Sequence, residues 1–430
     1  MKFIQNIILS IAILAIVGVI FYYEDKRDVS ASNINLPINE MQAFSEAFLK
    51  IKQNYVDDVS NKQLFDNAIK GMLEGLDPHS TFLNEKDFED LQIGTKGEFG
   101  GLGLEVTMDN ELVKVITPID DTPAYRAGIK AGDIIIKIDE NLVNEMSLNK
   151  AVDLMRGEIG TAVSLTILRK QETNPIEIKI IREKIQIKSV KYEIIDKNYA
   201  YIRISSFQDN TGSSLRNAMK NLKKISNNIN GYILDLRNNP GGVLEASVEV
   251  SDVFIKDRKK LLFTKGRTQD SIYEFTSDDI DLAEDKPIVV IINEGSASAA
   301  EIVAGALQDH KRAIIMGKQS FGKGSVQTVL PVTSNTALKI TTARYFTPNG
   351  RSIQAMGITP DIIVESLKFN NIEKNEMIKE SNLKGHLKNN GSKKIDNASS
   401  TVENKLVKDD YQLSEALNLL KGISIFALKK

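Results

Sequence analysis

The chain has 430 residues with no cysteine, no tryptophan and three histidines, and its 55 basic side chains nearly balance 57 acidic ones. The length suggests two or three domains. The absence of thiols excludes disulfides, iron–sulfur sites and a cysteine nucleophile, and it argues against redox chemistry. His79, His310 and His386 lack any ligand spacing, so we expect no metal centre. The net charge of −2 shows no excess of basic residues of the kind that proteins use to bind nucleic acid.

An apolar run at residues 7–23 opens the chain. Seventeen residues at about 1.5 Å each cover most of a hydrocarbon core of roughly 30 Å. Lys2 precedes the run and residues 24–28 carry no net positive charge, which favours an N-terminus inside and export of the rest. We therefore predict an uncleaved membrane anchor at residues 1–24. A cleaved signal peptide is the alternative, with small residues at 29–31 but beyond a charged stretch.

Helical periodicity follows in residues 40–75 and predicts two helices broken near Asp57 and Asp58, within a helical segment at 36–87. The apolar positions that carry this period are Phe44, Phe48, Ile51, Leu64, Ala68, Ile69, Met72 and Leu73.

A region of short strands occupies residues 88–172, opened by a glycine-rich segment at 97–104. One helix is expected at 148–155. The expected strands are 104–108, 112–116, 134–138, 163–168 and 176–181, the last of them beyond this region.

From residue 199 apolar strands alternate with helices, which predicts an α/β core at 173–367. The fold class is therefore multidomain, α+β and α/β. A polar segment at 368–406 reads as a flexible linker, and Asp409 or Asp410 would cap a final amphipathic helix within 407–430. The core elements expected are strands 201–204, 231–236 and 288–292 and helices 213–225, 244–254 and 299–307.

A serine turn joins a buried strand to a helix that begins near Ser298. This arrangement presents a hydroxyl at a helix N-terminus, where free N–H groups and the helix dipole stabilise an oxyanion. Ser298 and Glu301 also fit a capping box, in which the hydroxyl only caps the helix. The spacing alone leaves both interpretations open.

A nucleophilic serine needs a base, and the histidines do not offer one. His310 lies about 18 Å along the same helix, and His79 reads as a structural turn residue. Lys323 lies between two glycines ahead of a shielding apolar stretch, and the neutral Gln327 could orient its amine. Lowering a lysine pKa from about 10.4 to roughly 7 to 8 costs about 3 to 5 kcal/mol, which requires burial. A solvated loop lysine is the other interpretation.

A rival motif overlaps this lysine. Residues 317–323 fit the first seven positions of a phosphate loop, and the apolar run 232–235 ends in an aspartate that could help hold magnesium. Gly324 lacks the hydroxyl that the eighth position requires, and the following residues are β-branched where a helix is needed. We therefore discount nucleotide hydrolysis.

The turn at 235–242, DLRNNPGG, follows a strand and places two glycines behind a proline. Such a turn can expose backbone N–H groups in a nest that adds a second oxyanion donor. A plain strand-to-helix turn is the alternative.

The chain resembles the C-terminal processing peptidases, also called tail-specific proteases, over residues 40–367 and again in the last helix. The motifs that carry the resemblance are LDPHS at 76–80, GLGLE at 101–105, DLRNNPGG at 235–242, NEGSASAAEI at 293–302, GKQSFGKGSVQ at 317–327 and YFTPNG at 345–350.

The resemblance assigns roles to the residues above. It implies that Ser298 is the nucleophile, Lys323 the base and Gln327 its support. It implies oxyanion donors at the amide of Ala299 and at Gly241 or Gly242, and leaves the choice of glycine open.

The resemblance also implies a PDZ domain at about 88–172. Amides around Gly101, Leu102 and Gly103 would cradle a terminal carboxylate, while the strand from Leu104 pairs with the tail. Arg156 matches an arginine that links PDZ position to activity in related enzymes. The helices at the two ends resemble dimerisation segments, although ordinary packing onto the core is the alternative.

We therefore expect a serine endopeptidase, anchored in a bacterial inner membrane with its catalytic part on the periplasmic side, that binds unstructured protein C-termini and cuts nearby by a serine–lysine dyad. It would need no cofactor and would form a homodimer. An inert PDZ scaffold and, less favoured, a phosphate-loop nucleotidase are the alternatives.

Overall fold

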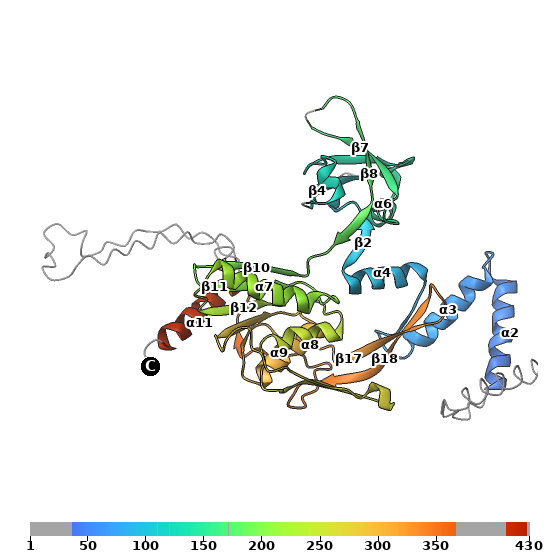
Figure 1. Cartoon of the computed structure of the whole chain (residues 1–430). Helices are drawn as coiled ribbons and strands as arrows, with labels where there is room; N and C mark the ends of the chain where they lie inside the picture. The colour runs from blue at the N-terminus through green and yellow to red at the C-terminus, as the bar shows by residue number, and fades with distance from the viewer. Residues whose placement is uncertain (1–36, 110, 120, 171, 367–409, 428–430) are drawn as a thin grey trace, which may run out of the picture. The chain divides into compact units, whose positions relative to one another are not determined.

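The computed structural model describes residues 37–109, 111–119, 121–170, 172–366 and 410–427 (Figure 1). The predicted anchor at 1–24 and the predicted linker at 368–406 lie outside these residues. Within the described ranges, no helix has both the length and the apolar character needed to cross a membrane. Contacts divide the chain into two units, Met1–Ile69 and Lys70–Lys430.

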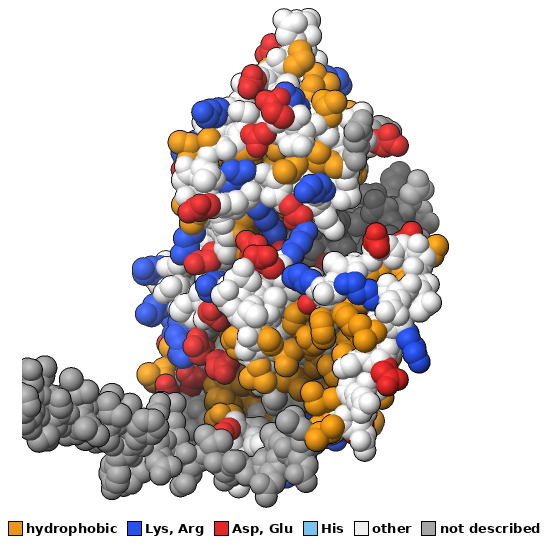
Figure 2. Space-filling model, turned by 90° about the vertical axis from the view of Figure 1, so that its right-hand side faces the viewer, with side chains coloured by type: hydrophobic (Ala, Val, Ile, Leu, Met, Phe, Trp, Pro, Cys, Tyr) orange, Lys and Arg blue, Asp and Glu red, His pale blue; other side chains and the backbone are white. Residues whose placement is uncertain are grey.

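In the first unit, two helices flank the predicted break at residues 57–58. Helix α2 (Ile38–Asn54) is followed by α3 (Asn61–Glu74), which continues into the second unit. The Phe65 ring lies 4.9 Å from the Phe48 ring between centroids, which joins the two helices. Helix α2 buries none of its residues. Figure 2 shows patches of exposed hydrophobic side chains on the side of the molecule that faces the viewer. The large apolar side chains exposed on α2 are Ile38, Met41, Phe44, Leu49 and Ile51.

In the second unit, the strand-rich region forms one sheet of order β3-β4-β5-β7-β8, with β6 paired to β5. Alternate side chains of these strands pack with helix α6 into a hydrophobic core of their own. The predicted strands and helix are confirmed, with small shifts at their ends. The elements are β3 (Leu104–Asp109), β4 (Leu112–Pro118), α5 (Pro123–Arg126), β5 (Ile134–Ile138), β6 (Asn141–Leu142), η1 (Val143–Glu145), α6 (Leu148–Met155), β7 (Ala162–Leu168) and β8 (Ile176–Ile181).

A two-stranded ribbon, β2 (Glu98–Gly101) with β9 (Glu183–Gln186), flanks this sheet in the sequence. Helix α4 (Glu85–Lys96) precedes the ribbon and ends at Gly97, whose φ of 70° places it in the left-handed region that glycine favours.

The α/β core contains a six-stranded sheet of order β10-β11-β12-β15-β16-β19. All neighbours are parallel except β10 and β11. The strands are β10 (Val190–Ile195), β11 (Tyr199–Ile204), β12 (Gly231–Asp235), β15 (Ile288–Ile292), β16 (Ile314–Gly317) and β19 (Ile362–Ile363).

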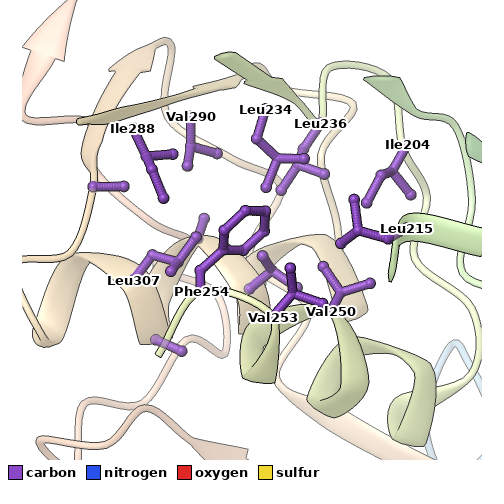
Figure 3. Close-up of a cluster of buried hydrophobic side chains, with 14 of the residues drawn as sticks. Ile204, Leu215, Leu234, Leu236, Val250, Val253, Phe254, Ile288, Val290 and Leu307 are labelled. Carbon is purple, nitrogen blue, oxygen red and sulfur yellow. The ribbon is translucent and has the colours of Figure 1, made fainter. Parts of the chain in front are cut away.

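Helices cover both faces of this sheet because alternate strand residues point to opposite sides. Leu234 and Val290 pack with α7 (Thr211–Ile225), α8 (Leu244–Asp252) and α9 (Ala299–Asp309) on one face, as Figure 3 shows. Ile233 and Val289 instead pack against α11 (Tyr411–Ala427) on the other face. The N-terminus of α11 is capped by Asp410, whose Oδ1 accepts the Leu413 amide at 3.1 Å, so one of the two predicted caps is confirmed.

A second sheet, which we did not predict from the sequence, has the order β1-β18-β13-β14 with β17 also paired to β18. It brings residue 81 beside residue 339, although 258 positions separate them in the chain. The strands are β1 (Thr81–Leu83), β13 (Lys260–Gly266), β14 (Glu274–Thr276), β17 (Ser325–Pro331) and β18 (Ala337–Phe346), and the short helix η2 (Gln269–Ser271) lies between β13 and β14.

Candidate active site

Three loops meet at the carboxyl edge of the parallel strands. They follow the adjacent strands β12, β15 and β16 and hold residues 236–242, 293–298 and 318–324. The Ala297 amide donates to the Asn239 carbonyl at 2.9 Å, and the Phe321 amide donates to the Ser296 carbonyl at 3.0 Å. The carboxyl edge of such a sheet is where ligands usually bind.

The serine turn exposes one hydroxyl and buries the other. Ser298 is the N-cap of α9, partly exposed, with φ 53° and ψ −114°, a region that residues with a Cβ rarely adopt. Such strain costs about 1 to 3 kcal/mol and clusters at functional sites. Ser296 is fully buried, and its hydroxyl donates to the Leu236 carbonyl at 2.8 Å while accepting the Asn293 amide at 3.0 Å. Ser298 is therefore the serine whose side chain faces the site.

The Glu301 carboxylate connects the serine turn to the lysine loop. Glu301 is the N3 residue of the capping box and is fully buried. Oε2 accepts the amides of Ser298 at 2.8 Å and Lys323 at 2.9 Å. Oε1 accepts the Gly322 amide at 2.7 Å and the Ser320 hydroxyl at 2.5 Å. Burial raises the pKa of Glu301, and these four hydrogen bonds oppose that effect.

The side chain of Lys323 is half-buried beside the serine turn. Among the described residues, its ammonium makes no hydrogen bond to Ser298 Oγ or to Gln327. Gln327 Nε2 donates to Ser325 Oγ at 2.9 Å and to Thr341 Oγ1 at 3.3 Å. The structure thus brings the two predicted residues into one site, while the predicted contact between Gln327 and the amine is not made in it.

Burial lowers the pKa of Lys323 below its ordinary value, and the positive charge of Lys339 lowers it further. The carboxylates of Asp77 and Glu301 act in the opposite direction but do not cancel the shift. A lysine with a lowered pKa can lose its proton closer to neutral pH and so serve as a base.

The turn at residues 77–80 also belongs to the surroundings of Lys323, which our sequence analysis missed. Asp77 Oδ1 accepts the amides of His79 at 2.8 Å and Ser80 at 3.0 Å, and the Ser80 hydroxyl accepts the Thr341 amide at 3.1 Å. Burial and then the charge of Lys323 lower the pKa of His79. His79 does lie in a tight turn, as expected, but that turn is placed near the lysine by strand pairing that the sequence pattern did not reveal.

The Pro-Gly-Gly turn packs directly on the serine. A Cβ added to Gly241, whose φ is 96°, would lie 2.8 Å from Ser298 Cβ and 3.0 Å from the Ala299 nitrogen. The Gly241 amide donates to Asn239 Oδ1 at 2.9 Å. The amides of Gly242 and Ala299 have no hydrogen-bond acceptor in the described part of the chain, so both are free for a ligand.

The rival phosphate-loop interpretation does not fit the fold. The loop at 318–324 leads into strand β17 and not into the helix that a phosphate loop requires. The described residues also contain no group of three or more His, Cys, Asp or Glu side chains that could hold a metal ion. A hydroxyl, a lysine of lowered pKa and free amides together suit acyl transfer.

Comparisons with known proteins give the family. Residues 198–364 match the model of peptidase family S41, residues 100–180 match a PDZ domain, and residues 22–87 match the N-terminal domain of activating protease CtpB. A carboxy-terminal-processing protease of Bartonella bacilliformis is 45% identical over 399 residues, which are 92% of each chain. The chain belongs to peptidase family S41. It is a serine-type peptidase with a PDZ domain, as the sequence motifs predicted.

Two further relatives of this S41 peptidase are more distant. A probable CtpA-like serine protease of Staphylococcus haemolyticus is 36% identical over 77% of this chain and 66% of its own. The solved structure of a photosystem II D1 C-terminal processing protease is 32% identical, with a TM-score of 0.44, and the match covers 74% of this chain and 86% of that one.

In the PDZ domain of this S41 peptidase, hydrogen bonds to backbone carbonyl groups hold the loop at residues 101–103, which was predicted to bind a terminal carboxylate. The carbonyl oxygens of Leu102 and Gly103 accept the amides of Ala124 and Ile119, each at 2.9 Å. Because a peptide unit is planar and trans, the amides of Gly103 and Leu104 point to the opposite side, where a ligand could bind them.

Arg156 is the C-cap of α6 and contacts one residue of strand β2 and one of helix α4. Its guanidinium lies 4.7 Å from the centroid of the Phe99 ring and 3.3 Å from Asp90 Oδ1. Its Nε is buried without a hydrogen-bond partner. The role of Arg156 in linking PDZ position to activity stays a prediction.

Proposed function

We propose that this S41 peptidase cleaves proteins near their C-termini with Ser298 as nucleophile and Lys323 as general base. The observation that carries the proposal is the single carboxylate oxygen, Glu301 Oε2, that accepts the amides of both residues. It brings the two residues into one site although 24 residues separate them in the sequence. The strained backbone of Ser298 and the lowered pKa of Lys323 support the same assignment.

The reaction would proceed through an acyl-enzyme. The neutral Lys323 amine takes the Ser298 hydroxyl proton as Oγ attacks the carbonyl carbon, and the resulting ammonium then gives that proton to the leaving amine. Lys323, neutral again, next takes a proton from the water that attacks the ester, and its ammonium returns that proton to Ser298 Oγ as the ester bond breaks and the new C-terminus leaves. We propose that Gln327, with Nε2 held by Ser325 and Thr341, turns Oε1 toward the lysine amine.

The oxyanion of each tetrahedral intermediate would be held by two backbone amides. Ala299 supplies the first, because it is the first amide of α9 and the helix leaves it unpaired. Of the two glycines, we propose Gly242, since Asn239 already accepts the Gly241 amide. Removing one such donor typically slows an enzyme about 10²- to 10³-fold.

The substrate would be an unstructured protein C-terminus held by the PDZ domain. The amides of Gly103 and Leu104 would bind its terminal carboxylate, and strand β3 would pair with the tail by β-augmentation. The relative named as a carboxy-terminal-processing protease supports this choice of substrate.

The proposal is tested by digesting a purified protein that carries an unstructured apolar tail and following its intact mass. Ser298→Ala and Lys323→Ala should each abolish shortening of the tail. Lys318→Ala, which removes a partly exposed lysine of the same loop that pairs with Glu294 and Glu365, should cleave at the wild-type rate. Wild-type cleavage by either of the first two variants would reject the dyad, and an inactive wild-type protein would favour the inert PDZ scaffold.

We also propose a membrane-anchored homodimer on the exported side of a bacterial inner membrane. The apolar run at 7–23 supports the anchor, and the uncovered apolar side chains of α2 support self-association. Alkaline extraction of membranes should leave the full chain in the pellet, and light scattering in detergent should give twice the chain mass. A chain released by the wash, or a monomer mass, would contradict the respective claim.

A further inference from the structure

A buried tyrosine contacts the lysine loop of the candidate site, and no sequence motif assigned a function to it. Tyr345 belongs to β18, is 1% exposed and pairs with Thr264 of β13. Its amide donates to the Gly324 carbonyl at 3.0 Å, and its hydroxyl donates to the Lys323 carbonyl. Backbone and side chain of Tyr345 thus both hold the lysine loop.

The Tyr345 hydroxyl reaches the loop at the proposed base itself. A phenol has one proton to donate, and that proton is directed at the Lys323 carbonyl, which can only accept. The Tyr345 side chain also packs in the same buried hydrophobic cluster as Ala299, the residue that follows the proposed nucleophile. Tyr345 therefore contacts the backbone of the lysine loop and belongs to the core that contains the start of α9.

Tyr345 remains protonated in this setting. Burial raises its pKa well above the ordinary value, and the nearby charge of Glu301 raises it further. The hydroxyl therefore cannot compete with Lys323 as a base. The hydroxyl can instead hold the backbone of the lysine loop in place through its hydrogen bond.

We propose that Tyr345 is a positioning residue that fixes the Lys323 loop beside the serine turn before substrate binds. Glu301 joins the amides of Ser298 and Lys323, and Tyr345 holds the carbonyl groups of Lys323 and Gly324. These two connections hold different backbone groups of the lysine loop, so neither alone fixes its position. The inference rests on the proposed Ser298 and Lys323 dyad.

The Tyr345→Phe variant tests the inference because it keeps the ring and removes only the hydroxyl. The kcat for a tailed substrate should fall roughly 10- to 100-fold, since small displacements of reacting groups cost this much, while KM changes less than about twofold. Labelling of the active serine by a small fluorophosphonate should slow by a similar factor, because that reaction does not depend on tail binding.

Tyr232→Phe is the matched control. Tyr232 is also buried in the core, at 2% exposure, but lies in β12 outside the three loops, and its variant should keep the wild-type kcat. Rates are expressed per folded molecule, with the folded fraction taken from near-ultraviolet circular dichroism, so partial unfolding does not imitate the effect.

A Tyr345→Phe kcat within twofold of wild type would overturn the inference, as would an equal loss in Tyr232→Phe or a change confined to KM. Ser298→Ala separates this result from the proposed function. If Ser298→Ala still cleaves, the dyad itself is wrong; if it is inactive and Tyr345→Phe is fully active, only the positioning role fails.

Discussion

Replacing Glu301 with glutamine would disrupt the connection between the serine turn and the lysine loop while preserving side-chain size. Each carboxylate oxygen accepts two hydrogen bonds in the structure, from Ser298 and Lys323 on one side and from Gly322 and Ser320 on the other. A glutamine amide offers a single acceptor oxygen, so its NH₂ group would face one pair of donors.

The size of the effect follows from that count. At least two hydrogen bonds to a charged acceptor are lost, each contributing about 1.5 to 3 kcal/mol, which gives about 3 to 6 kcal/mol in all. Expressed wholly in the transition state, this loss lowers kcat/KM by about 10²- to 10⁴-fold. Expressed wholly in the free energy of unfolding, it lowers Tm by about 6 to 24 °C for a domain of this size.

Both quantities can be measured on one preparation of Glu301→Gln, with tail cleavage for kcat/KM and thermal unfolding for Tm. Glu294→Gln is the matched control, since Glu294 is exposed in the same turn and pairs with Lys318. The control should match wild type in both assays. A Glu301→Gln variant with wild-type activity and wild-type Tm would refute the idea that this carboxylate holds the two segments together.

Two further predictions follow from the surroundings of the dyad. Lys339→Met removes a positive charge that lowers the pKa of Lys323, so that pKa should rise. Since the base acts when deprotonated, the rising limb of the pH profile of kcat/KM should move to higher pH, and an unmoved limb would count against Lys323 as the base. Gly241→Ala would place a Cβ 2.8 Å from Ser298 Cβ and should lower kcat by at least about 100-fold. Gly128→Ala, with a similar φ of 81° but open space around the new Cβ, should leave kcat unchanged; equal rates in the two variants would contradict the steric argument.

The strands and helices of the PDZ region and the α/β sheet could be predicted because their apolar residues are dense and periodic. The strand Ile288–Ile292 is wholly buried and reads as one apolar run, and the helix Leu148–Met155 shows its period clearly. The sheet that includes β17 and β18 could not be predicted, because exposed and buried positions in these strands follow no strict alternation.

Only part of the candidate site could be predicted from the sequence, because some of its contacts depend on pairing between distant strands. Ser298 and Lys323 carry local signals, a helix start and a pair of flanking glycines, that a sequence displays. The contacts of Tyr345 and of the turn at Asp77 depend on β18 pairing with β1 and β13, which are distant in sequence. Glu301 showed the capping box in advance, but its contacts with the lysine loop appear only when two neighbouring parallel strands bring both loops to one edge.

The central claim is that the Ser298 hydroxyl is the nucleophile, and the most direct test is to locate a covalent label. The wild-type chain would be treated with a fluorophosphonate, digested and mapped by mass spectrometry. We expect a single adduct on Ser298, lost in Lys323→Ala, because deprotonation by the lysine drives the attack. An adduct on Ser296, or an active enzyme whose labelled residue lies elsewhere, would contradict the account.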